Sequence, residues 1–102
     1  MATIRQRLPG QHPAAQGHFP GNPIIPGAVL LSETVRLIEA ELGRSLAPYR
    51  IRRAKFPHFA RPGDELVIAF TGSARSAIRF ECAVSGATVL VGEVECCASS
   101  TG

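Results

Sequence analysis

The side chain best suited to chemistry is His18, which stands in a stretch of unusual composition between residues 17 and 27. This stretch reads Gly-His-Phe-Pro-Gly-Asn-Pro-Ile-Ile-Pro-Gly. Proline fixes the backbone φ angle and removes a hydrogen-bond donor, and glycine lets the backbone come close to a ligand. We therefore expect an irregular, stiff loop that holds the imidazole of His18 in one place. A neutral imidazole is a suitable general base near pH 7.

A helix is expected directly after this loop. Pro26 suits the first turn of a helix, where its missing N–H group costs nothing. The apolar periodicity predicts a helix from Ala28 to Leu42, with Gly43 at the C-cap position. The N-terminal end of a helix offers partial positive charge and unpaired N–H groups, which stabilise negative charge on an oxygen. A histidine beside that end suits chemistry on a carbonyl group.

The faces of this helix indicate what must surround it. At 100° per residue it has two apolar arcs and one polar stripe. The first arc contains Ala28, Leu31, Val35, Ile38 and Leu42, the second contains Val29, Leu30, Leu37 and Ala40 with Glu33 among them, and the polar stripe contains Ser32, Arg36, Glu39 and Gly43. Because two arcs require cover on more than one side, we expect a sheet that curls around the helix and a second subunit that buries the remainder.

The rest of the chain predicts strands. A short strand over residues 3–8 precedes the helix, and four strands follow it over residues 49–59, 65–71, 76–84 and 88–97. Pro57 marks a bulge or an edge in the first of these four strands. Short loops between consecutive strands favour an antiparallel meander. We therefore predict one α+β domain over residues 1–102, in which residues 98–102 form a frayed tail.

Composition and charge limit the class of protein. The chain is 45% hydrophobic and 19% charged, as is typical of a folded globular domain. It contains no apolar run of about 18 residues and does not begin with a signal-peptide pattern, so we expect a cytoplasmic protein without membrane contact. The formal charge of +3 is mild. The basic cluster Arg50, Arg52, Arg53 and Lys55 has no nucleic-acid motif beside it, which leaves an acidic protein partner or a solvated face.

Cys82, Cys96 and Cys97 give no sign of a metal site or a disulfide framework. Their number is odd, and they lack the spacing of paired ligands. Adjacent residues of a strand point to opposite faces, so Cys96 and Cys97 would chelate poorly. We expect reduced cysteines that act as small apolar fillers, and no metal.

Two motifs resemble the β-hydroxyacyl-(acyl-carrier-protein) dehydratases of the hot-dog fold. Residues 17–27 closely resemble the active-site signature of that family. Lys55-Phe56, together with Arg61-Pro62-Gly63-Asp64-Glu65-Leu66, resembles the strand and turn that follow its central helix. The resemblance implies an antiparallel sheet wrapped around one long central helix. It also implies a dimer with a substrate tunnel at the subunit interface, and it implies no cofactor.

The resemblance also implies roles for individual residues. His18 would abstract the α-proton of a 3-hydroxyacyl thioester bound to acyl carrier protein, and the N–H of Gly27 would hold the thioester oxygen. The residues implied to contact the substrate are Phe19, Pro26, Ser32 and Arg36. The implied activity is that of a hydro-lyase, which yields a trans-2-enoyl thioester. The basic cluster gains a role in this frame, because acyl carrier proteins are acidic.

The sequence departs from the family at the catalytic acid. In the family an acidic residue stands on the central helix of the facing subunit, at the position that Ser32 occupies here. A serine hydroxyl has far too high a pKa to replace a carboxylic acid. Glu33 follows one residue later, which turns it by about 100° around the helix. Arg36 stands where the family tends to have glutamine.

Three functions therefore remain open. The first is an active dehydratase in which Glu33, or a water molecule held by Ser32, replaces the missing acid. A carboxyl group among apolar neighbours would have a raised pKa, but Glu33 could instead pair with Arg36 or Arg44. The second is a non-catalytic subunit that binds acyl carrier protein or complements a partner dehydratase in a homo- or hetero-oligomer. The third is a hot-dog thioesterase in which Glu33 attacks the thioester.

Overall fold

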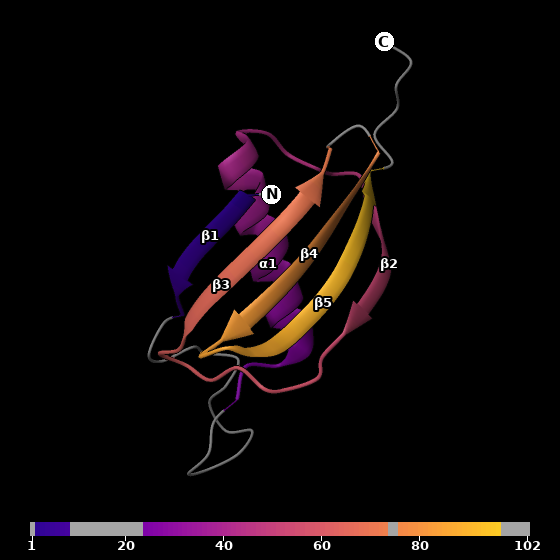
Figure 1. The fold of residues 1–102 in the computed structure, drawn as a ribbon. Coiled ribbons are helices and arrows are strands. Elements are labelled where there is room, and N and C mark those ends of the chain that lie inside the picture. The colour runs from indigo at the N-terminus through magenta and orange to yellow at the C-terminus, as the bar shows by residue number, and fades with distance from the viewer. Residues whose placement is uncertain (1, 9–23, 74–75, 97–102) are drawn as a thin grey trace.

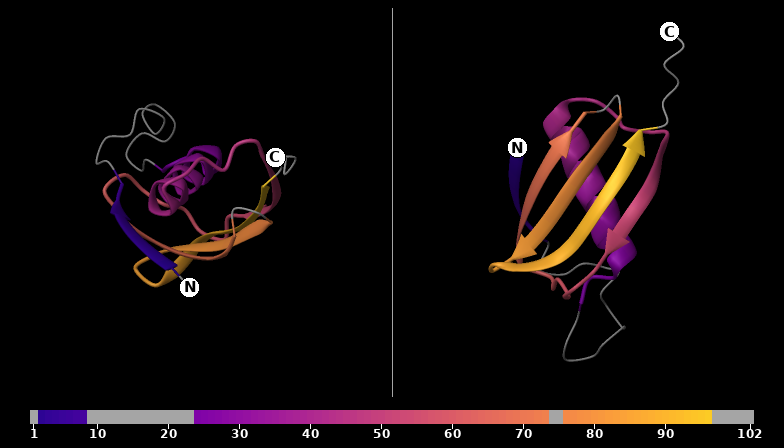
Figure 2. Two further views of the ribbon diagram at one scale, coloured as in Figure 1. Left: turned by 90° about the horizontal axis from the view of Figure 1, so that it is seen from above. Right: turned by 45° about the vertical axis from the view of Figure 1, so that its right-hand side comes forward.

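The computed structural model describes residues 2–8, 24–73 and 76–96. This part of the chain contains, in order, β1 (Ala2–Arg7), α1 (Gly27–Leu42), β2 (Tyr49–Lys55), β3 (Glu65–Gly72), β4 (Ala77–Val84) and β5 (Ala87–Cys96). The strands form one antiparallel sheet, and α1 lies across a single face of it (Figure 1). Seen from above, the sheet curves around the helix (Figure 2). The predicted α+β arrangement is confirmed.

The order of the strands corrects the predicted meander. The order is β1-β3-β4-β5-β2, so β3, β4 and β5 are consecutive neighbours as predicted, but β2 lies beside β5 and not beside β3. Hydrogen bonds between residues that are far apart in the sequence decide this order of strands. The Leu8 N–H donates to the Asp64 carbonyl over 2.7 Å, and the Gly63 N–H donates to the Leu8 carbonyl over 3.2 Å. These bonds bring the start of β3 to the end of β1, which leaves β2 at the opposite edge.

The limits of the elements agree with the prediction to within one residue, except at the end of β2. Helix α1 begins one residue earlier than predicted and ends at Gly43, which adopts φ 73° and donates its N–H to the Glu39 carbonyl. A left-handed residue at this position favours glycine. The predicted strand over residues 49–59 is too long at its end: β2 ends at Lys55, before Pro57, which has no N–H group to extend the strand pairing. Cys97 and residues 98–102 lie outside the described residues.

The helix faces the core along a line between the two predicted arcs. Its buried residues are Leu30, Thr34, Val35, Leu37 and Ile38, whereas Ala28 and Leu42 at the ends of the first arc are exposed. Thr34, which the sequence analysis did not single out, is fully buried. Its hydroxyl donates to the Leu30 carbonyl over 2.8 Å, so it lies in the core without an unpaired polar atom. The described part of one chain thus covers a single side of α1, and the second subunit remains a prediction.

The inward side chains of β3, β4 and β5 complete the core. They include Leu66, Ile68 and Phe70 from β3, Ile78, Phe80 and Cys82 from β4, and Leu90 and Val94 from β5. Burial raises the pKa of the Cys82 thiol to about 11. This thiol is therefore protonated at neutral pH and acts as the apolar filler that the sequence predicts. No helix in the described ranges is long and apolar enough to span a bilayer.

Candidate active site

The two motifs of the sequence meet at the N-terminal end of α1. The connection between β2 and β3, residues 56–64, passes this end of the helix (Figure 1). The Ile25 N–H, two residues before α1, donates to the Ala60 carbonyl over 2.8 Å. At the other end of the connection, Asp64 accepts a hydrogen bond from the N–H of Leu8, the residue that follows β1. Residues 60–64 therefore bind the chain on both sides of the stretch that contains His18.

The turn that makes these bonds explains the Arg-Pro-Gly-Asp sequence. The Asp64 carboxylate accepts a hydrogen bond from the Arg61 N–H over 2.8 Å, and the Asp64 N–H donates to the Arg61 carbonyl over 3.1 Å. Gly63 adopts φ 91°, a conformation that favours glycine. The Arg7 guanidinium donates to the Gly63 carbonyl over 2.9 Å, which ties the turn to β1. The motif is thus a rigid turn with bonds to two other segments.

Gly27 is the first residue of α1. The N–H groups of Val29 and Leu30 donate to the Pro26 carbonyl, each over 3.0 Å. No described residue accepts a hydrogen bond from the Gly27 N–H. Unpaired N–H groups at a helix start are suited to stabilising an oxyanion. The position predicted for Gly27 at the start of the helix is therefore confirmed, while its role remains a prediction.

The ring of Phe56 lies against Gly27. A Cβ atom added at Gly27 would stand 3.1 Å from two carbon atoms of this ring. Glycine is thus the residue that fits beneath the ring without displacing it. Phe56 belongs to the second motif, but the motif alone does not place its ring at the start of α1. Only contact between distant segments reveals that arrangement.

The polar side of α1 holds an ion pair. The Arg36 Nη2 atom lies 2.8 Å from Glu33 Oε2, and the Arg36 Nε atom lies 3.3 Å from Glu33 Oε1. The hydrogen bond to Glu33 raises the pKa of Arg36. The predicted alternative, in which Glu33 pairs with Arg36, is therefore confirmed. Both carboxylate oxygens of Glu33 are thus held by the guanidinium of Arg36 on the same helix.

Ser32, at the position of the family's catalytic acid, is exposed on the surface of α1. It stands five residues after Gly27, or about 7.5 Å along the helix axis. The structure describes five of the predicted site residues, namely Pro26, Gly27, Ser32, Glu33 and Arg36. His18 and Phe19 lie outside the described residues. The described part of the site therefore contains the N–H of Gly27 at the start of α1, while the position of the family's acid holds the hydroxyl group of Ser32.

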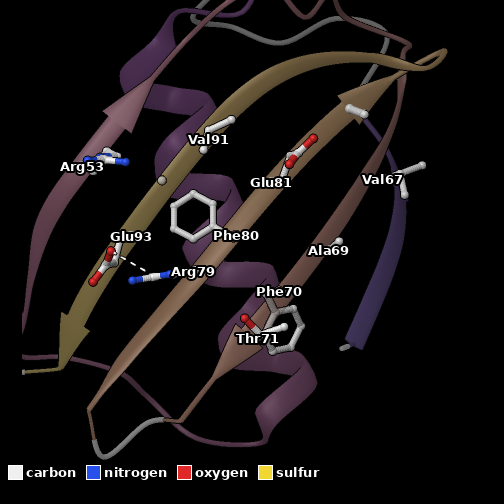
Figure 3. A pocket seen from close by; sticks show the side chains of 12 residues that line it. Arg53, Val67, Ala69, Phe70, Thr71, Arg79, Phe80, Glu81, Val91 and Glu93 are labelled. Atoms are coloured by element: carbon white, nitrogen blue, oxygen red, sulfur yellow. Dashed lines mark ion pairs between the residues drawn. The ribbon is translucent and has the colours of Figure 1, made fainter.

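A hollow of the described surface lies away from this end of α1. It has a volume of about 550 Å³ and lies on the face of the sheet that points away from α1, where Figure 3 shows Val67, Ala69, Glu81 and Val91 around it. A smaller hollow of about 390 Å³ lies beside the turn, next to His58, Phe59, Arg61 and Asp64. Phe59 is 67% exposed in this lining, and its place beside the turn could not be predicted from local sequence patterns. The large hollow is separate from the start of α1.

Comparison with known proteins identifies relatives among dehydratases. Residues 1–93 match the ApeI-like family, described as ApeI dehydratase. The chain is 34% identical over 77 residues to the 3-hydroxyacyl-(acyl-carrier-protein) dehydratase FabZ of Latilactobacillus sakei, covering 69% of this chain and 55% of the relative. It is 33% identical over 98 residues to FabZ of Sodalis glossinidius, covering 85% and 62%. The chain thus spans little more than half the length of these curated relatives.

Solved structures show the same fold. The dehydratase heterocomplex ApeI:P from Xenorhabdus doucetiae superposes with a TM-score of 0.72 at 18% identity, covering 91% of this chain and 83% of that one. A thioesterase complexed with coenzyme A and zinc from Thermus thermophilus superposes with a TM-score of 0.55 at 19% identity, covering 89% and 74%. At such identities the likeness concerns the fold alone. The predicted hot-dog fold is confirmed.

Proposed function

The chain belongs to the ApeI-like dehydratase family, and on this premise we propose that it is a dehydratase subunit for 3-hydroxyacyl thioesters carried on acyl carrier protein. The proposal depends on one observation. The turn at residues 60–64 binds the chain on both sides of the His18 stretch, at the end of α1 where the Gly27 N–H has no described acceptor. A base and an oxyanion donor would therefore be presented at one place.

The reaction would begin with proton removal. His18 would take the α-proton of the thioester, and negative charge would develop on the thioester oxygen. The Gly27 N–H and the helix end would stabilise that charge. The bond between the β-carbon and the hydroxyl oxygen would then break, and a general acid would protonate the departing group. The products would be water and a trans-2-enoyl thioester.

A second candidate function is a subunit whose site is completed by a different hot-dog subunit. The ion pair between Glu33 and Arg36 favours this reading, because an ionised carboxylate is a poor general acid. Ser32 cannot replace that acid. The structurally similar ApeI:P assembly is a heterocomplex. In this case the chain would contribute His18 and Gly27, and its partner would contribute the acid.

A product assay distinguishes the candidate reactions. The purified chain is given a 3-hydroxyacyl thioester, and enoyl absorbance and free thiol are followed together. Dehydration by the chain alone should give enoyl absorbance without thiol. A partner-dependent subunit should give neither product alone. Release of thiol without enoyl product would contradict the dehydratase proposal and indicate a thioesterase.

Replacing Ser32 by glutamate should raise the dehydration rate, because it restores a carboxyl group at the family's acid position. Arg36 lies one helical turn further on and would favour the ionised form of that carboxyl group, which limits the gain in the single variant. The double variant Ser32→Glu/Arg36→Gln should therefore be faster than Ser32→Glu. Rates are measured by enoyl absorbance at high protein concentration and high salt, with circular dichroism as the folding control. A folded double variant no faster than wild type would contradict an empty acid position.

A further inference from the structure

Arg7, at the end of β1 beside the start of β3, uses its side chain on a backbone group of the turn (Figure 1). Its register partner on β3 is Glu65, yet the Glu65 carboxylate lies 3.9 Å from Arg5 instead. The Arg7 guanidinium donates to the Gly63 carbonyl over 2.9 Å, and among the described residues no carboxylate pairs with it. A charged donor makes a stronger hydrogen bond than a neutral one. This exposed arginine therefore binds the turn and forms no ion pair across the strands.

The contact holds one side of a peptide group whose other side is already bound. In the peptide between Gly63 and Asp64, the carbonyl accepts from Arg7, and the N–H donates to the Arg61 carbonyl over 3.1 Å. Gly63 adopts φ 91° and, as a glycine, does not fix its own conformation. Without the Arg7 side chain, this peptide would be held on one side only. The orientation of the turn therefore depends on a side chain from another segment.

The turn is linked to the start of α1 by one buried hydrogen bond. Ala60, the first residue of the turn, accepts a hydrogen bond from the Ile25 N–H over 2.8 Å, and these two residues are 1% and 3% exposed. Protein interiors are closely packed, so a shift of one partner moves the other. Pro26, whose φ angle is −55°, then joins Ile25 to Gly27 through a stiff backbone. A displacement of the turn therefore reaches the Gly27 N–H within two residues.

We propose that Arg7 is a positioning residue. Through the turn at residues 60–64 it holds the start of α1, and with it the Gly27 N–H, in the orientation that the reaction requires. The inference rests on the proposed function, in which that N–H stabilises charge on the thioester oxygen. Arg7 lies outside both motifs that resemble the dehydratases, and it acts through the turn without touching the reacting atoms. Because the charge develops in the transition state, a misplaced donor lowers kcat more than it changes KM.

Replacing Arg7 by alanine should lower kcat for dehydration by about tenfold and leave KM within about twofold of wild type, because small displacements of a catalytic group are costly. The Arg7→Lys variant should recover most of the rate, since an ammonium group can also donate to the Gly63 carbonyl. Rates are measured from enoyl absorbance with a 3-hydroxyacyl thioester, under conditions in which wild type is active. The Tm of both variants should stay within about 4 °C of wild type, as is usual for exposed side chains.

Amide hydrogen exchange followed by NMR measures the same coupling without substrate. In Arg7→Ala, the Ile25 N–H should exchange about tenfold faster than in wild type, whereas the N–H of Ile38, further along α1, should keep its rate. Arg5→Ala is the matched control, because it removes the same charge from the same strand and breaks only an exposed ion pair with Glu65. This control should leave kcat and the exchange of Ile25 unchanged.

Each of the following results would overturn the inference. Exchange at Ile25 that does not respond to Arg7→Ala would show that the turn holds the start of α1 without Arg7. Faster exchange with an unchanged kcat would show that the Gly27 N–H tolerates the shift. An equal effect of Arg5→Ala, or faster exchange throughout the sheet with a fall in Tm, would show a general loss of stability. A wild-type chain that gives no enoyl product would instead contradict the proposed function, and the exchange at Ile25 would still decide whether Arg7 holds the start of α1.

Discussion

Replacing His18 by alanine should lower the dehydration rate by about 10²–10⁴-fold, the usual contribution of a general base. The expected cause is loss of the group that accepts the α-proton, while the Gly27 N–H and the turn at residues 60–64 stay in place. The rate is measured from enoyl absorbance with a 3-hydroxyacyl thioester, under conditions in which the wild-type chain is active. The thermal unfolding midpoint should change little.

His58 provides the control for this experiment. It lies in the connection after β2, beside the smaller hollow and on the same side of the molecule as the turn. The His58→Ala variant should keep the dehydration rate within about twofold of wild type, as is usual for surface substitutions. A folded His18→Ala variant with the wild-type rate would show that another group removes the α-proton. Loss of activity in both variants would show that the effect of His18→Ala is not specific to the proposed base.

Replacing Gly92 by valine should destabilise the sheet strongly. A Cβ atom at Gly92 would lie 2.5 Å from Phe80 Cζ and 3.0 Å from the Arg53 carbonyl oxygen. Phe80 is only 3% exposed and the Arg53 oxygen belongs to the backbone of β2, so relief of the contact requires movement of a buried ring or of a strand. Overpacking of this kind costs about 1–3 kcal/mol or more, which corresponds to a loss of roughly 10 °C in Tm. Thermal unfolding followed by circular dichroism measures the loss.

Two further variants test the cause of this loss. Gly27→Ala makes a milder contact, 3.1 Å from the ring of Phe56, and that residue is 43% exposed and can shift, so Tm should change little. The double variant Gly92→Val/Phe80→Leu should recover part of the stability, because the two residues are in contact. A Gly92→Val chain with the wild-type Tm would show that the β4–β5 pair can move apart without cost.

Local features of the chain could be predicted from the sequence with good accuracy. Helix α1 was predicted to within one residue, because its apolar periodicity and Gly43 act over a few neighbouring residues. The strands were found for the same reason, through alternation and turn residues. The resemblance of residues 17–27 to a dehydratase signature indicated the family, because the types and spacing of these residues are unusual. Each of these features depends on residues close together in the chain.

Only the tertiary structure decided which distant segments meet. Strand β2 lies beside β5 because hydrogen bonds from Leu8 to the turn at residues 60–64 place β3 beside β1. Loop length alone could not give that result. The contact of Phe56 with Gly27 has the same origin, since it joins segments that are far apart in sequence.

The state of Glu33 was likewise decided by geometry. Its sequence position allowed a carboxyl group among apolar neighbours or an ion pair, and the structure shows the pair with Arg36. The choice depends on which part of α1 the sheet covers. Thr34 faces the core, which turns Glu33 and Arg36 toward the surface together. Periodicity gives the angle between two residues of a helix, but packing against the sheet decides which of them is buried.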